Sequence, residues 1–303
     1  MLMRAAMRHV RWAGLAALAC AAITLGACGA SSKSSSSTTG AKGSHTLSLS
    51  ISESGKTAVF TVPSSATGGL VTISLANKGS MPHGAQFVLI KGNHSTQQTL
   101  QALGASMKSG KTPAWLRAEG GPPNAFPGQT SSATQNLPAG KYLVADFGGA
   151  SNGPPAYTQL LVSSASASGS LPSAPATVTA AANGKDKYKW ELSGAPLATG
   201  QNRIRFASKG KATLHLVGAF RIVGNPSRQQ MINFLKSNSN GPPPKFVDLT
   251  SFDATAALDG GRSQVSTLSF AKPGKYVLFC PLHDRDGGKA HFQEGMLKTI
   301  TVK

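Results

Sequence analysis

An internal repeat is the sequence feature that most constrains the fold of this chain. Residues 83–98, HGAQFVLIKGNHSTQQ, align without gaps with residues 215–230, HLVGAFRIVGNPSRQQ, at an offset of 132. Each copy continues with a Gly-Pro-Pro turn and then a Gly-Lys-Tyr sequence that leads into an apolar run, at residues 140–145 and 274–279. Since 303 residues suffice for two domains with proper cores, the repeat predicts two units of one fold.

Strand signals surround the repeated segments. Apolar, β-branched runs at residues 46–52, 56–62 and 70–77 precede His83, and runs at residues 188–192 and 202–208 precede His215. Ser95 with Gln98, and Ser227 with Gln230, have capping-box spacing, and each pair opens one short helical pattern. We therefore predict an all-β protein of two antiparallel β-sandwiches, each with one short helical insertion, over residues 46–164 and 176–303, with a linker at 165–175.

The N-terminus has the pattern of a targeting segment. Three arginines precede an apolar run at residues 12–25 that is too short for a good membrane span. The run ends in Leu25-Gly26-Ala27-Cys28, which resembles a bacterial lipobox. The resemblance implies a lipoprotein signal peptide at residues 1–27, lipidation of Cys28, and a low-complexity tether at 28–45. The chain would then be lipid-anchored at the extracytoplasmic face of the cell membrane; the alternative is an ordinary secretory signal.

The charge balance indicates the kind of partner. The formal net charge is +19, and removal of the three signal arginines leaves +16, spread without a dense basic block. Few aromatic residues are interleaved with the basic ones, so nucleic acid is not an expected partner. An anionic envelope surface or an acidic redox partner protein fits this balance better.

Cysteine usage directs attention to the end of the chain. Cys20 leaves with the signal peptide and Cys28 would carry lipid, so only Cys280 remains as a thiol and no internal disulfide is possible. Cys280 follows the strand-like run at residues 274–279, and His283, His291 and Met296 come after it. A thiolate, imidazoles and a thioether form the soft donor set that suits copper.

This C-terminal pattern resembles the cupredoxin family, which includes plastocyanin and azurin. The spacing His291-x4-Met296, with glycine before methionine, is that of the plastocyanin type, and His215 occupies the place of the upstream histidine. The resemblance implies Greek-key sandwiches and one type 1 copper site held by His215, Cys280, His291 and Met296. His291 comes eleven residues after the cysteine, which is farther than in short-loop members. His283, at the short Cys-x2-His spacing, is therefore an alternative ligand.

The two copies differ where the metal ligands are expected. Alignment of the Gly-Lys-Tyr sequences places Asp146 at the position of Cys280, and no histidine or methionine follows it closely. His83 corresponds to His215, but it lacks the soft partners. We therefore expect a degenerate first domain in which His83 is structural, with a weak site shared with Asp146 as the alternative.

The same residues restrict the function classes. No histidine is part of a His-x-His pair, which the trinuclear cluster of multicopper oxidases requires, and Phe279 occupies the place of the bridging histidine of copper nitrite reductases. We therefore expect a non-enzymatic protein that transfers single electrons. The alternatives are an envelope copper carrier or sensor, and a metal-free β-sandwich interaction module.

Overall fold

The computed structural model describes residues 44–55, 57–146, 155–164, 169–183, 187–210, 213–237 and 242–303. The predicted signal peptide, the lipidation site Cys28 and nearly all of the predicted tether lie outside the described residues. Within these ranges no helix has the length and apolar character needed to cross a membrane. The all-β prediction is confirmed, because the described regular structure consists of strands and two helices.

The chain contributes its elements in two successive groups. The first half contains β1 (His45–Ser54), β2 (Thr57–Thr61), β3 (Ser65–Thr67), β4 (Gly69–Asn77), β5 (Gln86–Ile90), α2 (Thr96–Ser109), β6 (Leu116–Ala118), β7 (Thr130–Leu137), β8 (Gly140–Ala145) and β9 (Tyr157–Ser163). The second half contains β10 (Ala176–Ala182), β11 (Tyr188–Gly194), β12 (Gly200–Ser208), β13 (Leu214–His215), β14 (Gly218–Ile222), α3 (Arg228–Lys236), β15 (Val247–Ala254), β16 (Leu258–Asp259), β17 (Arg262–Phe270), β18 (Gly274–Phe279) and β19 (Leu297–Val302).

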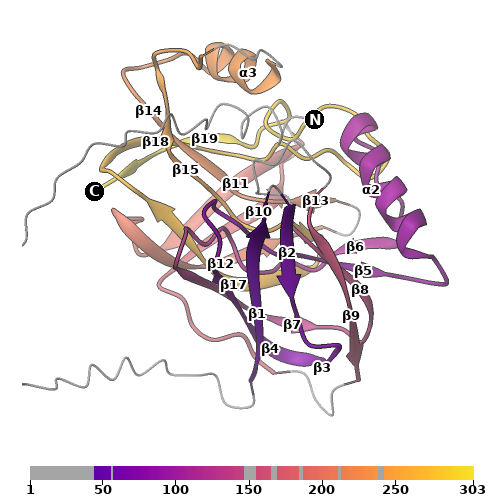
Figure 1. Ribbon diagram of the computed structural model, residues 1–303. Coiled ribbons are helices and arrows are strands. Elements are labelled where there is room, and N and C mark those ends of the chain that lie inside the picture. Colours follow the sequence, from indigo (N-terminus) through magenta and orange to yellow (C-terminus); the bar gives the residue numbers. More distant parts are fainter. Residues whose placement is uncertain are drawn as a thin grey trace, which may run out of the picture.

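One large sheet runs through both halves. Its strand order is β11-β10-β12-β17-β7-β4-β1-β2, and the halves meet where β17 pairs with β7, through Gln264 with Gln135 and Val265 with Thr134. A five-stranded sheet, β3-β9-β8-β5-β6, belongs to the first half, and a four-stranded sheet, β15-β14-β18-β19, belongs to the second. Figure 1 shows the large sheet crossing the middle of the molecule. The two halves are therefore joined by backbone hydrogen bonds.

The prediction of purely antiparallel sandwiches is wrong. β1 pairs with β4 in parallel, β10 pairs with β12 in parallel, and β3 pairs with β9 in parallel. Alternating apolar residues determine which face of a strand is buried, but they carry no information on strand direction. The segments between β1 and β4, and between β10 and β12, are long enough for the crossover that parallel neighbours require.

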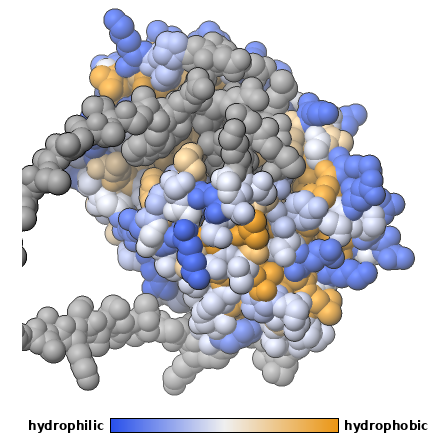
Figure 2. Space-filling model, in the orientation of Figure 1, coloured by the Kyte–Doolittle hydropathy of each residue, from blue (hydrophilic) through white to orange (hydrophobic). Residues whose placement is uncertain are grey.

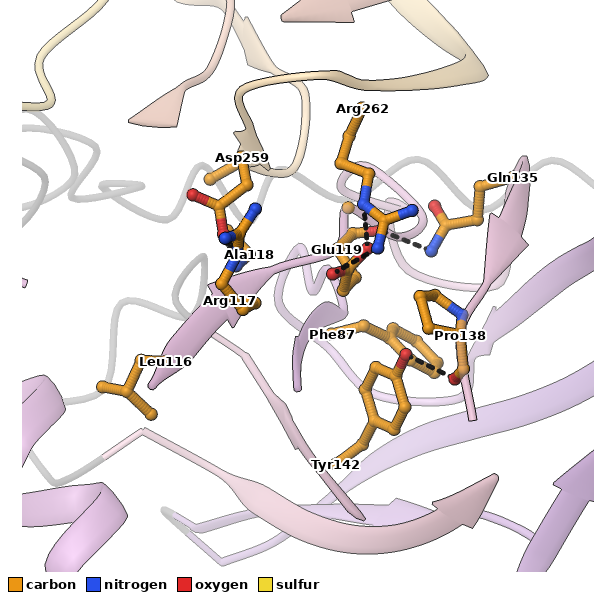
Figure 3. A network of polar contacts seen from close by, with 12 residues as sticks. Phe87, Leu116, Arg117, Ala118, Glu119, Gln135, Pro138, Tyr142, Asp259 and Arg262 are labelled. Carbon is orange, nitrogen blue, oxygen red and sulfur yellow. Dashed lines mark hydrogen bonds and ion pairs between the residues drawn. The ribbon is translucent and has the colours of Figure 1, made fainter. Parts of the chain in front are cut away.

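Each half buries its own core between two sheets. In the first half, alternate residues of β1 and β4 pack against Phe87 of β5 and Tyr142 of β8. In the second half, Phe206 of β12 and Phe270 of β17 pack against Tyr276 of β18. The hydroxyl of Tyr142 donates to Pro138 O at 2.8 Å (Figure 3). In the same way, the hydroxyl of Tyr276 donates to Lys272 O at 2.8 Å. A hydrogen bond thus satisfies each buried hydroxyl.

The two helices begin where the capping boxes predicted. Ser95 caps α2, and Gln98 hydrogen bonds back to the Ser95 backbone; Ser227 and Gln230 do the same for α3. α2 lies at the right edge of the view in Figure 1 and α3 at its top. Since reciprocal capping satisfies two orphan N–H groups, it determines the first residue of each helix.

Figure 2 shows hydrophilic residues over most of the visible face, with some apolar residues near β2. Val59 of β2 and Tyr157 and Leu161 of β9 are among the large apolar side chains that remain exposed. Scattered exposed apolar residues of this kind are normal for a folded domain.

Candidate metal centre

Cys280 lies directly after β18, in the core of the second half. Its side chain is fully buried in the same apolar cluster as Met296. Burial raises the pKa of the Cys280 thiol to about 12, although hydrogen bonds from the backbone N–H groups of Leu216 and Leu282 lower it. The two N–H groups offset only part of the effect of burial, so the thiol is protonated near pH 7.

His215 lies on the short strand β13, one residue before Leu216. Its Nδ1 lies 2.9 Å from the hydroxyl oxygen of Ser208, at the end of β12. Its Nε2 is buried, and no described residue gives it a hydrogen-bond partner. A buried imidazole nitrogen without a partner costs free energy, so this atom is a natural ligand position for a metal.

His291 and Met296 are held by a tight turn. The His291 carbonyl accepts hydrogen bonds from the backbone N–H groups of Glu294 (3.0 Å) and Met296 (2.9 Å), and Gly295 has a φ of 109°. The backbone N–H of Cys280 donates to Met296 O at 3.2 Å. The His-x4-Met spacing therefore brings the methionine backbone back against the cysteine.

Three of the four predicted ligands, His215, Cys280 and His291, lie close together. His291 Nδ1 lies 3.5 Å from Cys280 Sγ, and the rings of His215 and His291 have centroids 4.8 Å apart. Burial lowers the pKa of His215 to about 3, and burial lowers that of His291 to about 4 against the opposing effect of Asp284. Both imidazoles are thus neutral at pH 7, which is the form that binds a metal.

His283 lies apart from this group. Its Nδ1–H donates to Gly288 O at 2.9 Å, and its ring lies against Gly110, at the end of α2. Of the two histidines that the sequence left open, only His291 therefore contacts the Cys280 sulfur. The metal role of these side chains stays a prediction.

Two residues near the candidate site were missed by the sequence analysis. The Tyr188 ring lies 5.3 Å from the His215 ring and 4.6 Å from the His291 ring, measured between centroids. Its hydroxyl donates to Asp284, and an oxygen of Asp284 lies 3.2 Å from His291 Nε2. Because Tyr188 is distant in the sequence from the loop at residues 280–296, no local sequence pattern predicts this contact.

An oxygen-rich group adjoins the thiol site. Asp284, His291 and Glu294 offer ligand atoms that lie within 4.8 Å of one another. The ammonium group of Lys187 bonds to Asp284 and lies 3.8 Å from Glu294. Since this lysine already supplies positive charge, the carboxylates are better explained as its partners than as ligands of a second cation.

The long spacer between Cys280 and His291 docks on the first half. Arg285 donates to Pro113 O and Leu116 O, each at 2.8 Å, and also to Asp259. The Arg117 Nε lies 2.6 Å from Asp259 Oδ2 (Figure 3). The fully buried carboxylate of Asp259 thus contacts both Arg117 of the first half and Arg285 of the spacer.

A second ion pair lies nearby in the same interface. Arg262 of β17 pairs with Glu119, which follows β6, at 2.9 Å, and the backbone carbonyl of Glu119 accepts from Gln135 (Figure 3). Burial raises the pKa of Glu119, against the opposing charge of Arg262. The charge of each group is thus compensated across the junction between the halves.

The first half replaces the soft donors with an ion-paired histidine. His83 Nδ1 lies 2.6 Å from Asp146, and its Nε2 lies 2.8 Å from Glu53. Burial lowers the pKa of His83, but its bonds to Asp146 and Glu53 raise it more, so the net shift is upward. Both ring nitrogens are occupied by carboxylates, which favours the structural role over a metal site.

This ion-paired group predicts a pH dependence of stability. Burial raises the pKa of Glu53, but hydrogen bonds from Ser80, His83 and Met81 lower it to about 2. Its contribution is therefore present above pH 4.5 and is lost as the pH falls toward 2. The His83 contribution is complete below pH 6.5 and is lost as the pH rises through its raised pKa.

The corresponding experiment compares Glu53→Gln with the unchanged protein. Between pH 5 and 2.5 the unchanged protein should lose about 1–2 kcal/mol more unfolding free energy than the variant, measured by urea denaturation. Equal losses in the two proteins would contradict this assignment.

Comparisons with known proteins add little to this description. No family model and no curated protein matches the chain. Among solved structures, the chain is similar to auracyanin A, a "blue" copper protein from Chloroflexus aurantiacus, with 21% identity, coverage of 39% of this chain and 100% of that one, and a TM-score of 0.28. It is also similar to a copper nitrite reductase from Nitrosomonas europaea, with 13% identity, coverage of 86% and 94%, and a TM-score of 0.24. Likenesses at these TM-scores carry no argument about the function of this chain.

Proposed function

We propose that this chain is a cupredoxin-like protein that binds one type 1 copper ion in its second half and transfers single electrons. The observation that carries the proposal is the close approach of one buried thiol, Cys280, and two buried imidazoles, His215 and His291. A thiolate and two imidazoles, with the weak thioether of Met296, form the donor set of blue copper sites. Bound copper would supply one-electron chemistry at this position.

The residues of this chain would hold such an ion with little rearrangement. Cys280, His291 and Met296 are linked by backbone hydrogen bonds within one loop, and the β13–β16 pairing holds His215. All four side chains are at most 1% exposed, so water is excluded from the donors. A rigid, dry ligand set favours rapid electron transfer because few groups must reorganise.

Two further parts of the proposal concern the duplication of the fold and the attachment of the chain to a membrane. We infer a duplicated Greek-key sandwich, which is supported by β5 and β14, and by α2 and α3, beginning at the offset of 132 found in the sequence. We also infer a lipid anchor at Cys28 on the extracytoplasmic face, which is supported by the lipobox pattern alone.

The test is the absorption spectrum after addition of Cu(II) to the purified protein, with two histidine variants. The unchanged protein and His283→Ala should develop the intense copper–thiolate absorption band near the red end of the visible spectrum. His291→Ala should not develop this band. Thermal unfolding of both variants serves as the control for folding. Loss of the colour in His283→Ala with retention in His291→Ala would reverse the ligand assignment, and absence of copper binding in all three would leave a metal-free interaction module.

A further inference from the structure

A cavity of about 500 Å³ lies between the two halves. One wall comes from α2, including Leu103 and Ser106, and from residues just before β5. The opposite wall comes from the second half, including Leu214, Leu216 and Leu282. Cavities of this volume with mostly apolar walls are typical of sites that hold small organic molecules.

The charged groups at this cavity have one sign. Lys108, in the last turn of α2, and Lys236, in the last turn of α3, both line it, together with the imidazole of His283. No aspartate or glutamate is found among its described lining residues. The helix ends carry only partial negative charges, so the two ammonium groups leave the cavity positive.

We propose that this cavity binds an organic anion: an apolar body with one carboxylate, sulfonate or phosphate group. The aliphatic walls remove the body from water, which is the main source of affinity. The two lysines attract the charged group and, in the absence of acidic neighbours, favour an anion over a neutral or cationic molecule of the same shape.

The occupant would contact the part of the chain that holds the thiol. Leu216 and Leu282 line the cavity, and their backbone N–H groups lower the pKa of the Cys280 thiol. On the other side, Gly110 caps the C-terminus of α2, and a Cβ added there would lie 2.9 Å from the His283 ring. The ligand would therefore bridge both halves, and its binding does not depend on a metal.

The experiment uses the metal-free purified chain and the fluorescent anion 8-anilinonaphthalene-1-sulfonate. One molecule should bind per chain, and dodecanoate should displace it about tenfold better than the neutral dodecanol does. Two variants fill the cavity from opposite walls, Ala256→Phe and Ser106→Phe, and each should weaken binding more than tenfold. The double variant Lys108→Gln/Lys236→Gln should lose about tenfold for the anions and nothing for dodecanol.

The matched control is Lys91→Gln/Lys141→Gln, which removes two exposed lysines that do not line the cavity. This control should bind the probe like the unchanged protein, and thermal unfolding should show that all variants fold. The proposal is overturned by binding that survives both filling variants, or by equal losses in the two lysine pairs. Because no metal is present, these outcomes are separate from the success or failure of copper binding.

Discussion

Replacement of Asp259 by alanine is expected to lower the unfolding free energy by about 3–5 kcal/mol. The Asp259 carboxylate is fully buried, bonds to Arg285, lies 2.6 Å from Arg117 and accepts the backbone N–H of Ala118. Its removal leaves two arginines partly buried without their anion, and desolvation of an unpaired charge is costly. Urea denaturation followed by circular dichroism measures the change.

A matched control is available on the surface. Glu191 also pairs with two cations, Lys189 and Lys209, but all three side chains are 42% exposed or more. Glu191→Ala should leave the denaturation midpoint unchanged, because exposed ion pairs contribute little. Similar losses for Asp259→Ala and Glu191→Ala would show that burial of the interface carboxylate has no special effect on stability.

Replacement of Cys280 by serine is expected to abolish the red absorption on addition of Cu(II). The substitution should also weaken copper binding by more than about a hundredfold. Changes to residues that only contact a metal ligand already weaken metal binding by up to about a hundredfold, and loss of a ligand should cost more. A serine oxygen in this apolar pocket has a high pKa and donates little charge to copper, whereas a thiolate is the ligand that soft metals select. Absorption spectroscopy and isothermal titration calorimetry measure the two effects.

Met296→Leu is the control for this prediction. Leucine nearly preserves the volume of methionine, so the core should remain packed, and a weak axial ligand is not required for the copper–thiolate colour. The variant should therefore stay coloured with a shifted band. A Cys280→Ser protein that keeps the colour would exclude the thiol as a ligand.

Local patterns predicted much of the fold. The capping boxes at Ser95 and Ser227 identified both helix starts, because the signal lies within four residues. Alternating apolar residues identified strands such as β1, β4 and β12, but not which of them would pair in parallel. The β7–β17 junction was not predicted, since its pairs, such as Gln135 with Gln264, are distant in sequence and carry no local mark.

The candidate site was also predicted only in part from the sequence. The spacing from His291 to Met296 favoured His291 over His283, and the structure has His291 Nδ1 3.5 Å from the cysteine sulfur. Tyr188 and the anchoring role of Arg285 could not be predicted, because both depend on which distant segments the fold brings together. Nor did the sequence explain the eleven-residue spacing after Cys280, which makes sense once Arg285 is seen to bond to the first half.

This docked spacer has a consequence for any attempt to work with the second half alone. The loop that supplies His291 takes its shape partly from carbonyl groups of residues 113 and 116, which an excised fragment would lack. Such a fragment would expose Asp259 and Arg285 together with the edge of β17. The first half therefore supports the conformation of the loop that carries His291, and a protein intended to keep that conformation must contain both halves.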